Sequence, residues 1–264
     1  MSLDSSQHLY ESPDIVQYYA QRQGVLFGEN ALLKAAARKI TSGRVLDVGV
    51  GAGRTTPILL EFHPAKYLGV DYSAGMVDHC RKRFPDSEFQ VADARSMPDL
   101  PDGSFDFVLF SWNGIDSVDF EGRIAVVREV FRLLAPGGLF AFSSANGRNL
   151  PPRPWSAAAL RAMDIDWRKP KQFLYGTAQW LLGLIHFLRL RSLEVSRDDH
   201  SIRVDQAHNF KLVRCLVSPS QQALQLSRAG FIETRIFDRD GSEFLLSNAS
   251  FDSCPVCYLA KKPE

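Results

Sequence analysis

A short apolar run that ends in three glycines constrains this chain more than any other segment. Residues 44–50 read RVLDVGV, and Gly49, Gly51 and Gly53 alternate with small apolar residues before Arg54. Such a run is typical of a buried strand. The glycines allow a sharp turn in which a ligand lies against the main chain without meeting a Cβ atom. The segment therefore predicts a strand, a ligand-binding loop and a helix, in that order.

Strands and helices alternate regularly after this loop. We expect strands at 66–73, 87–94, 105–112 and 139–146, and helices at 54–62, 74–84 and 121–135. This alternation predicts βαβ units and a parallel sheet, that is, an α/β fold of the Rossmann-like kind. Ligands of such sheets bind beyond the carboxyl ends of the strands. Four segments are expected to meet at that edge: Asp47–Gly53, Asp71–Tyr72, Asp93–Ala94 and Ser111–Asn113.

The spacing of the glycines bears on the kind of ligand. Dinucleotide-binding loops follow G-x-G-x-x-G. Here the sixth position is Arg54 and the spacing is G-x-G-x-G, which disfavours a nicotinamide cofactor. Asp71 ends the next strand about 20 residues further on, where a carboxylate can accept both ribose hydroxyls of an adenosine. Asp93 and Ala94 end the third strand, where a side chain and a backbone N–H can meet an adenine edge.

Five motifs now stand in a recognisable order over residues 40–145: VLDVGVGAGR, GVDYSAGM, VADARSMP, FDFVLFSWNGID and LLAPGGLF. In this order and spacing they resemble the class I S-adenosylmethionine-dependent methyltransferases. SPSQQALQLSRAGF, near the C-terminus, resembles the last helix of small-molecule members. The resemblance implies S-adenosylmethionine as the cofactor. It also implies a seven-stranded sheet with the last strand antiparallel, helices on both faces and an N-terminal helical lid. The regular alternation breaks at residues 147–205, which predicts a helical insertion after the fifth strand.

The family pattern implies both a domain plan and a cofactor site. We expect an N-terminal helical lid (1–40), a cofactor-binding core (41–146), a substrate-cap insertion (147–205) and a C-terminal segment that completes the sheet (206–264). The residues expected to bind the cofactor are Tyr19, Arg22, Asp47, Gly49, Gly51, Asp71, Tyr72, Met76, Asp93, Ala94 and Ser111. Asp47 and the glycines would meet the methionine part, and Arg22 its carboxylate. Tyr72 and Met76 would flank the adenine.

The insertion and the residue that follows it are candidates for the acceptor side. Residues 148–197 carry nine basic residues against three acidic ones. They form either a solvated helix surface or a lid that favours an anionic or membrane-associated acceptor; Trp155, Trp167, Tyr175 and Trp180 would then line the pocket. His208 is the candidate catalytic residue, as a general base, and a packed structural histidine is the alternative.

Methyl transfer from a sulfonium is a direct displacement that depends mainly on alignment, so the lack of an obvious catalytic dyad does not count against activity. We expect a methyltransferase that acts on a small molecule. A non-catalytic cofactor-binding module and a methyltransferase with a macromolecular or lipid-like acceptor are the alternatives. The net charge of +1 indicates no general attraction to nucleic acid. Ser111–Gly114 also lacks the Asn/Asp-Pro-Pro-aromatic motif of many nucleic-acid methyltransferases.

The remaining features concern location and metals. Four cysteines are few for 264 residues, which favours a reducing, cytoplasmic location. No signal peptide or transmembrane segment is recognisable. Cys254 and Cys257 form a C-x-x-C pair with no second ligand pair, so no metal site is expected. The sequence leaves the oligomeric state open.

Overall fold

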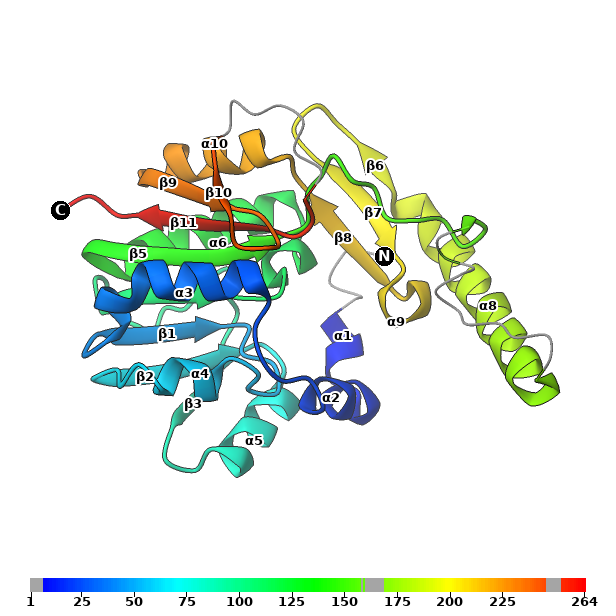
Figure 1. Ribbon diagram of the computed structural model, residues 1–264, viewed down its shortest axis with the longest axis horizontal. Coiled ribbons are helices and arrows are strands. Elements are labelled where there is room, and N and C mark those ends of the chain that lie inside the picture. The colour runs from blue at the N-terminus through cyan, green and yellow to red at the C-terminus, as the bar shows by residue number, and fades with distance from the viewer. Residues whose placement is uncertain (1–6, 158, 160–168, 246–252) are drawn as a thin grey trace.

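Eight strands form the central sheet of the structure, a computed structural model that describes residues 7–157, 159, 169–245 and 253–264. Their order across the sheet is β10-β9-β11-β5-β4-β1-β2-β3 (Figure 1). The strands are β1 (Arg44–Val48), β2 (Lys66–Asp71), β3 (Glu88–Val91), β4 (Phe105–Phe110), β5 (Leu134–Ser144), β9 (Ile232–Phe237), β10 (Glu243–Phe244) and β11 (Val256–Lys261). The predicted α/β, Rossmann-like arrangement is confirmed.

The direction of the strands follows the family pattern, with one strand more than predicted. β1 to β5 are parallel, whereas β11 is antiparallel to both of its neighbours, β5 and β9. The sheet has eight strands rather than seven because β10 pairs with β9 at the edge, with Glu243 opposite Phe237. A strand of two residues is too short for an apolar alternation to be recognised in the sequence.

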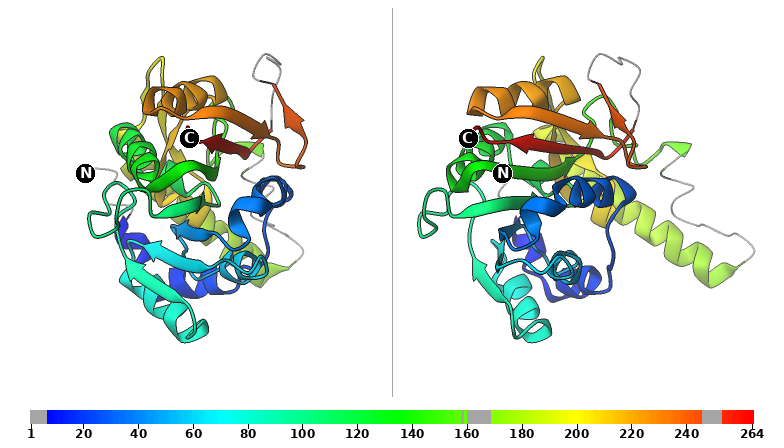
Figure 2. Two further views of the ribbon diagram at one scale, coloured as in Figure 1. Left: turned by 90° about the vertical axis from the view of Figure 1, so that its left-hand side faces the viewer. Right: turned by 60° about the vertical axis from the view of Figure 1, so that its left-hand side comes forward.

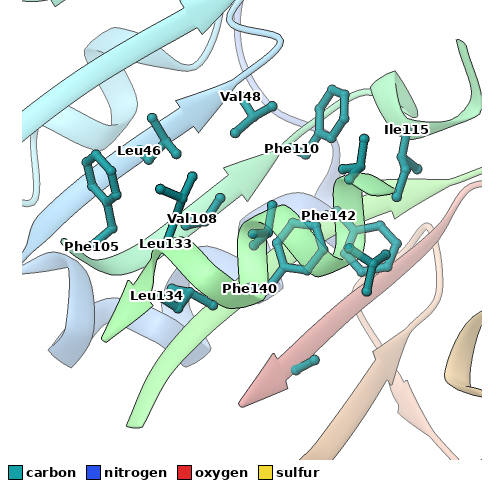
Figure 3. Close-up of a cluster of buried hydrophobic side chains, with 14 of the residues drawn as sticks. Leu46, Val48, Phe105, Val108, Phe110, Ile115, Leu133, Leu134, Phe140 and Phe142 are labelled. Carbon is teal, nitrogen blue, oxygen red and sulfur yellow. The ribbon is translucent and has the colours of Figure 1, made fainter. Parts of the chain in front are cut away.

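Helices cover both faces of the sheet, as the two views of Figure 2 show. On one face lie α3 (Phe27–Ile40), α4 (Thr56–Leu60) and α5 (Ala74–Arg83), and on the other α6 (Phe120–Leu133) and α10 (Pro219–Ala229). Figure 3 shows the cluster on the α6 side, where Phe110, Phe140 and Phe142 share one core with Ile115 and Leu133. Because both faces are covered, the central strands are continuously apolar rather than alternating.

The N-terminal 40 residues do not act as one unit. α3 buries Leu32, Leu33, Ala36 and Ile40 against the sheet, so it belongs to the core and not to a lid. α1 (Gln7–Tyr10) and α2 (Pro13–Ala20) instead lie near the carboxyl ends of β1 and β2 (Figure 1). The hydroxyl of Ser73 holds them there by donating a hydrogen bond of 3.1 Å to the carbonyl of Tyr10.

The insertion after β5 is built of one long helix and a separate small sheet. Its described elements are α8 (Pro170–Leu190), η3 (Arg191–Leu193), β6 (Val195–Ser196), β7 (Ser201–Asp205), α9 (Ala207–Phe210) and β8 (Leu212–Leu216). We predicted that the chain rejoins the large sheet after residue 205, and this is wrong. β8 pairs antiparallel with β7, placing Val204 opposite Val213, and both side chains pack with Phe187 of α8. The small sheet thus belongs to the insertion through residue 216.

A buried ionic cluster fastens the insertion to the core. Arg123 of α6 is fully buried and donates to Asp116 of η2 (Gly114–Ser117) at 2.6 Å, and to the carbonyl of Cys215 in β8 at 3.2 Å. It also donates to Ser144 and Gln222, which belong to β5 and α10. Five elements therefore meet on one guanidinium, which fixes the small sheet relative to the large one.

Candidate active site

The glycine loop after β1 has the backbone geometry that its sequence predicts. Gly49, Gly51 and Gly53 all have positive φ, between 55° and 80°. A Cβ atom on Gly49 would lie 2.5 Å from the ring of Phe110, so this glycine is required by packing. A Cβ atom on Gly51 would meet no atom within 4 Å. Gly51 therefore faces open space, and a side chain there would occupy room that a ligand needs.

Asp71 links this loop to the end of β2. One carboxylate oxygen accepts from the backbone N–H of Gly51 and the other from that of Ser73, each at 2.9 Å. Burial raises the pKa of Asp71, while these two hydrogen bonds act in the opposite direction. Each oxygen keeps a further lone pair, so the carboxylate can still accept hydroxyl donors from a ligand.

A single cleft joins the carboxyl ends of the strands and encloses about 1420 Å³ of empty space, part of it open to solvent. Ten of the predicted site residues line it: Tyr19, Gly49, Gly51, Asp71, Tyr72, Met76, Asp93, Ala94, Ser111 and His208. They come from six separate parts of the chain. Four of these parts follow β1, β2, β3 and β4, and the parallel sheet brings their carboxyl ends together. Tyr19 of α2 and His208 of α9 reach the cleft from outside that sheet.

Two predicted cofactor residues, Asp47 and Arg22, do not line the cleft. Asp47 is fully buried behind the glycine loop, where it accepts hydrogen bonds from Thr55 at 2.6 Å and Tyr67 at 3.1 Å. Burial raises the pKa of Asp47 to about 7. Its Oδ1 has no hydrogen-bond partner among the described residues. Arg22 lies over the ring of Tyr18, 4.6 Å from its centroid, and donates to its hydroxyl at 2.7 Å.

Arg54 occupies the cleft wall instead, and we did not predict a role for it. Its guanidinium forms a buried, two-pronged ion pair with Glu29 of α3, at 3.0 and 3.2 Å, and lies over the ring of Trp112. Glu29 also accepts the backbone N–H of Trp112 at 2.7 Å. One feature of the sequence could have placed Arg54 at the cleft, namely its position directly after the last glycine of the loop. Its partner, however, lies 25 residues upstream.

One end of the cleft is built around α5. Ser73 caps this helix by accepting the backbone N–H of Met76, which sets Tyr72 and Met76 at the cleft wall. Asp93 forms an ion pair with Arg95 at 2.7 Å. Burial alone would raise the pKa of Asp93, but the hydrogen bonds from Arg95 outweigh it and lower the pKa. The carboxylate is therefore ionised and held in place at neutral pH.

The opposite end of the cleft is aromatic and includes the cation of Arg214. Tyr10, Tyr18 and Tyr19 surround His208, with ring centroids between 5.0 and 6.4 Å from that of the imidazole. Arg214 of β8 also lines this end, and Asp205 lies 3.4 Å from its Nε. Within the described part of the chain, the two terminal nitrogens of Arg214 have no hydrogen-bond partner. An anion with an apolar body fits these surroundings.

His208 lies on a strained turn at this end. His208, Asn209 and Phe210 all adopt left-handed backbone conformations, with φ between 50° and 61°. Non-glycine residues rarely do so, and such strain is concentrated at functional sites. Burial lowers the pKa of His208, and the nearby Arg214 lowers it further. The imidazole is therefore neutral at pH 7. Its Nε2 lies 3.1 Å from the hydroxyl of Tyr19, whose pKa is raised by burial.

If the insertion formed a lid, four of its aromatic residues were expected to line the cleft. Trp155 and Tyr175 are exposed and Trp180 is half-buried, and none of the three lines the cleft. Trp167 lies outside the described residues. The insertion instead contributes Ala207, His208 and Arg214 to the cleft. α9 and β8, rather than the long helix α8, reach the site.

Comparison with known proteins agrees with this geometry. A family model described as a methyltransferase domain matches residues 45–138. A fatty-acid O-methyltransferase of Mycolicibacterium smegmatis is 36% identical over 209 residues, which cover 77% of this chain and 69% of that enzyme. A trans-aconitate 2-methyltransferase of Paracidovorax citrulli is 31% identical over 115 residues, 42% of each chain.

Solved structures support the fold. A Burkholderia thailandensis 1,6-didemethyltoxoflavin-N1-methyltransferase, crystallised with S-adenosylhomocysteine, superimposes with a TM-score of 0.57. The match covers 99% of this chain and 88% of that one, at 13% identity. A structure from Mesorhizobium loti, titled an S-adenosylmethionine-dependent methyltransferase, gives a TM-score of 0.56 at 19% identity, covering 88% and 98% of the two chains.

Proposed function

Since the chain belongs to the class I S-adenosylmethionine-dependent methyltransferases, we propose that it transfers the methyl group to the carboxylate of an apolar, lipid-like acid. The observation that carries this proposal is Arg214, a cation at the aromatic end of a cleft whose other end fits an adenosine. A relative named as a fatty-acid O-methyltransferase supports the same acceptor class.

The cleft fits the cofactor on three observations. The space in front of Gly51 is open, the Asp71 carboxylate keeps lone pairs for ribose hydroxyls, and Tyr72 and Met76 offer apolar surface to the adenine. Asp93 and the Ala94 N–H would meet the adenine edge, and Ser111 would lie near the sulfonium. Arg54 lines the cleft and Arg22 does not, so Arg54 rather than Arg22 would be the arginine near the methionine part. Bound S-adenosylmethionine supplies a methyl group whose departure leaves a neutral thioether, so no acid is needed.

The aromatic end of the cleft suits a carboxylate acceptor, because this acceptor needs no catalytic base. A carboxylic acid has a pKa near 4–5 and is already ionised at pH 7, so no proton has to be removed before attack. Arg214 would hold one carboxylate oxygen and thereby direct the other toward the methyl group. The surrounding tyrosines exclude water and contact the apolar chain.

With a carboxylate acceptor, His208 would not act as the general base that we expected. The Nε2 of its neutral imidazole lies at a tyrosine hydroxyl, so it would fix Tyr19 at the cleft. An alcohol or amine acceptor would instead require His208 to accept a proton. The two cases differ in how the rate depends on pH. Because the pKa of His208 is lowered below 6.5, the difference appears below that pH. A carboxylate acceptor gives a kcat that stays level from pH 7 down to 5.5, whereas proton removal by His208 makes kcat fall as the imidazole takes up a proton.

The acceptor is tested with a matched series of chains. The protein is incubated with S-adenosylmethionine and dodecanoate, dodecanol or dodecylamine, and methylated products are measured by gas chromatography with mass detection. We expect methyl dodecanoate alone, and we expect Arg214→Gln to raise KM for dodecanoate at least tenfold while leaving affinity for S-adenosylhomocysteine unchanged. Methylation of the alcohol or amine, or of no compound by a protein that binds S-adenosylhomocysteine, would contradict the proposal.

A further inference from the structure

One face of α8 is apolar and exposed, although the helix belongs to a folded insertion. Leu174, Leu181, Ile185 and Leu188 recur at spacings of seven, four and three residues, which places them on one side of the helix. Their exposed fractions are 67, 49, 44 and 48%. We call these four residues the α8 stripe. Scattered exposed leucines are ordinary on protein surfaces, but a continuous stripe marks an interaction surface.

The opposite face of α8 is packed against the part of the insertion that lines the cleft. Gly183 lies so close to α9 that a Cβ atom there would meet Asn209 at 2.3 Å. Asn209 donates to the carbonyl of Gln179 at 2.8 Å, and its own carbonyl lies 2.9 Å from Nδ1 of His186. The buried face therefore supports the turn that carries His208. The stripe points away from this contact, and α8 projects from the body of the molecule (Figure 1).

The charged residues of α8 and of the residues directly next to it in the sequence are all basic. Between residues 169 and 193 the sequence has no aspartate or glutamate, but it has Lys169 and Lys171 at one end of the helix and Arg189 and Arg191 at the other. All four are exposed. An apolar stripe with basic residues at both ends complements a surface that is apolar below and negatively charged above. A bilayer with anionic headgroups has both properties.

We propose that α8 docks the protein on an anionic membrane surface, with the α8 stripe among the acyl chains and the flanking lysines and arginines at the headgroups. None of the helices in the described parts of the chain is both long enough and apolar enough to cross a bilayer, so α8 lies along the surface. The proposal goes beyond the proposed function and does not depend on it. Docking would bring the turn at His208, and with it the aromatic end of the cleft, close to the membrane.

The test is co-sedimentation of the full-length chain with large vesicles, without any methyl acceptor. Vesicles of phosphatidylcholine and phosphatidylglycerol at 70:30 are compared with pure phosphatidylcholine. We expect binding to the anionic vesicles, at least tenfold weaker binding to the neutral ones, and weakening by salt because surface charges are screened. The double variant Leu181→Asp/Ile185→Asp should lose at least tenfold in vesicle affinity.

Controls separate docking from general damage and from self-association. Leu224→Asp changes a leucine that is 40% exposed on α10, outside the insertion, and should bind vesicles like the wild type. Thermal unfolding and affinity for S-adenosylhomocysteine should be unchanged in all three proteins, because every substituted side chain is exposed. No binding of the wild type, or equal binding of the double variant, would overturn the proposal. So would a wild-type dimer in sedimentation velocity that the double variant abolishes, because a second copy would then cover the stripe.

Discussion

The hydroxyl of Tyr19 lies 3.1 Å from Nε2 of His208, and this hydrogen bond joins two residues that are 189 positions apart. Tyr19 belongs to α2 at the N-terminus, and His208 belongs to the turn between the two longer strands of the insertion. The bond therefore closes the aromatic end of the cleft from two sides. Because the bond joins α2 to the insertion, its loss should lower the stability of the fold.

The first prediction concerns this contact and pH. The folded protein holds His208 neutral because its pKa is lowered, whereas in the unfolded chain the imidazole takes up a proton below pH 6.5. The unfolded state then binds more protons, so stability rises with pH in this range and is lost on acidification. We expect the wild-type melting temperature to fall between pH 7 and 5.5 more steeply than that of His208→Gln. Parallel curves for the two proteins would exclude this role.

The second prediction concerns Asp71 and the cofactor. Asp71→Asn removes the charge from a carboxylate that accepts the N–H groups of Gly51 and Ser73 and would accept the ribose hydroxyls. A hydrogen bond to a charged group contributes about 1.5–3 kcal/mol, so affinity for S-adenosylhomocysteine should fall roughly tenfold to a hundredfold in calorimetric titration. Asp78→Asn, at an exposed carboxylate of α5, serves as the control and should bind normally. Equal affinities would remove Asp71 from the site.

The third prediction concerns the buried pair of Arg54 and Glu29. Their side chains are only 9% and 2% exposed, so removal of either charge leaves the other without its partner in a medium of low polarity. Glu29→Gln and Arg54→Met should each reduce the free energy of unfolding by about 3–5 kcal/mol. The double variant should lose less than the sum of the two, by about 0.5–3 kcal/mol, because neither charge then remains. Urea titrations of the four proteins measure this difference, and strict additivity would show that the two residues act independently.

The sequence was sufficient to predict which strand ends line the cleft. Asp71, Asp93 and Ser111 follow apolar runs that are long enough to be recognised as strands, and parallel strands present their carboxyl ends at one edge. The order of strands and helices in the sequence was therefore enough to predict that these residues lie close together. The same reasoning placed Asp47 in the site, but the structure buries it behind the glycine loop. Strand periodicity indicates which face of a strand a side chain occupies, and it does not indicate what covers that side chain.

The aromatic end of the cleft could not be predicted in the same way, because it depends on tertiary contacts that no local sequence pattern encodes. Arg22 and Tyr19 lie on one predicted helix, and only the packing of α2 decides that Tyr19 faces the cleft while Arg22 lies on Tyr18. Arg214 lies on a strand that we assigned to the wrong sheet. The pairing of β8 with β7 makes it a wall of the cleft. The partnership of Arg54 with Glu29 likewise depends on how α3 packs against the sheet.

The last prediction separates the two roles that glycine plays in the loop. Gly49 and Gly51 both have positive φ, at 61° and 55°, so alanine at either position costs about 1–2 kcal/mol of backbone strain. At Gly49 the new Cβ would also collide with Phe110 at 2.5 Å, whereas at Gly51 it would enter open space in the cleft. Gly49→Ala should therefore lower the melting temperature more than Gly51→Ala. Gly51→Ala should lower affinity for S-adenosylhomocysteine at least tenfold in a protein that is still folded at 25 °C. If Gly51→Ala binds like the wild type, the open space beside this glycine is not where the cofactor lies, and the binding mode proposed for the loop is wrong.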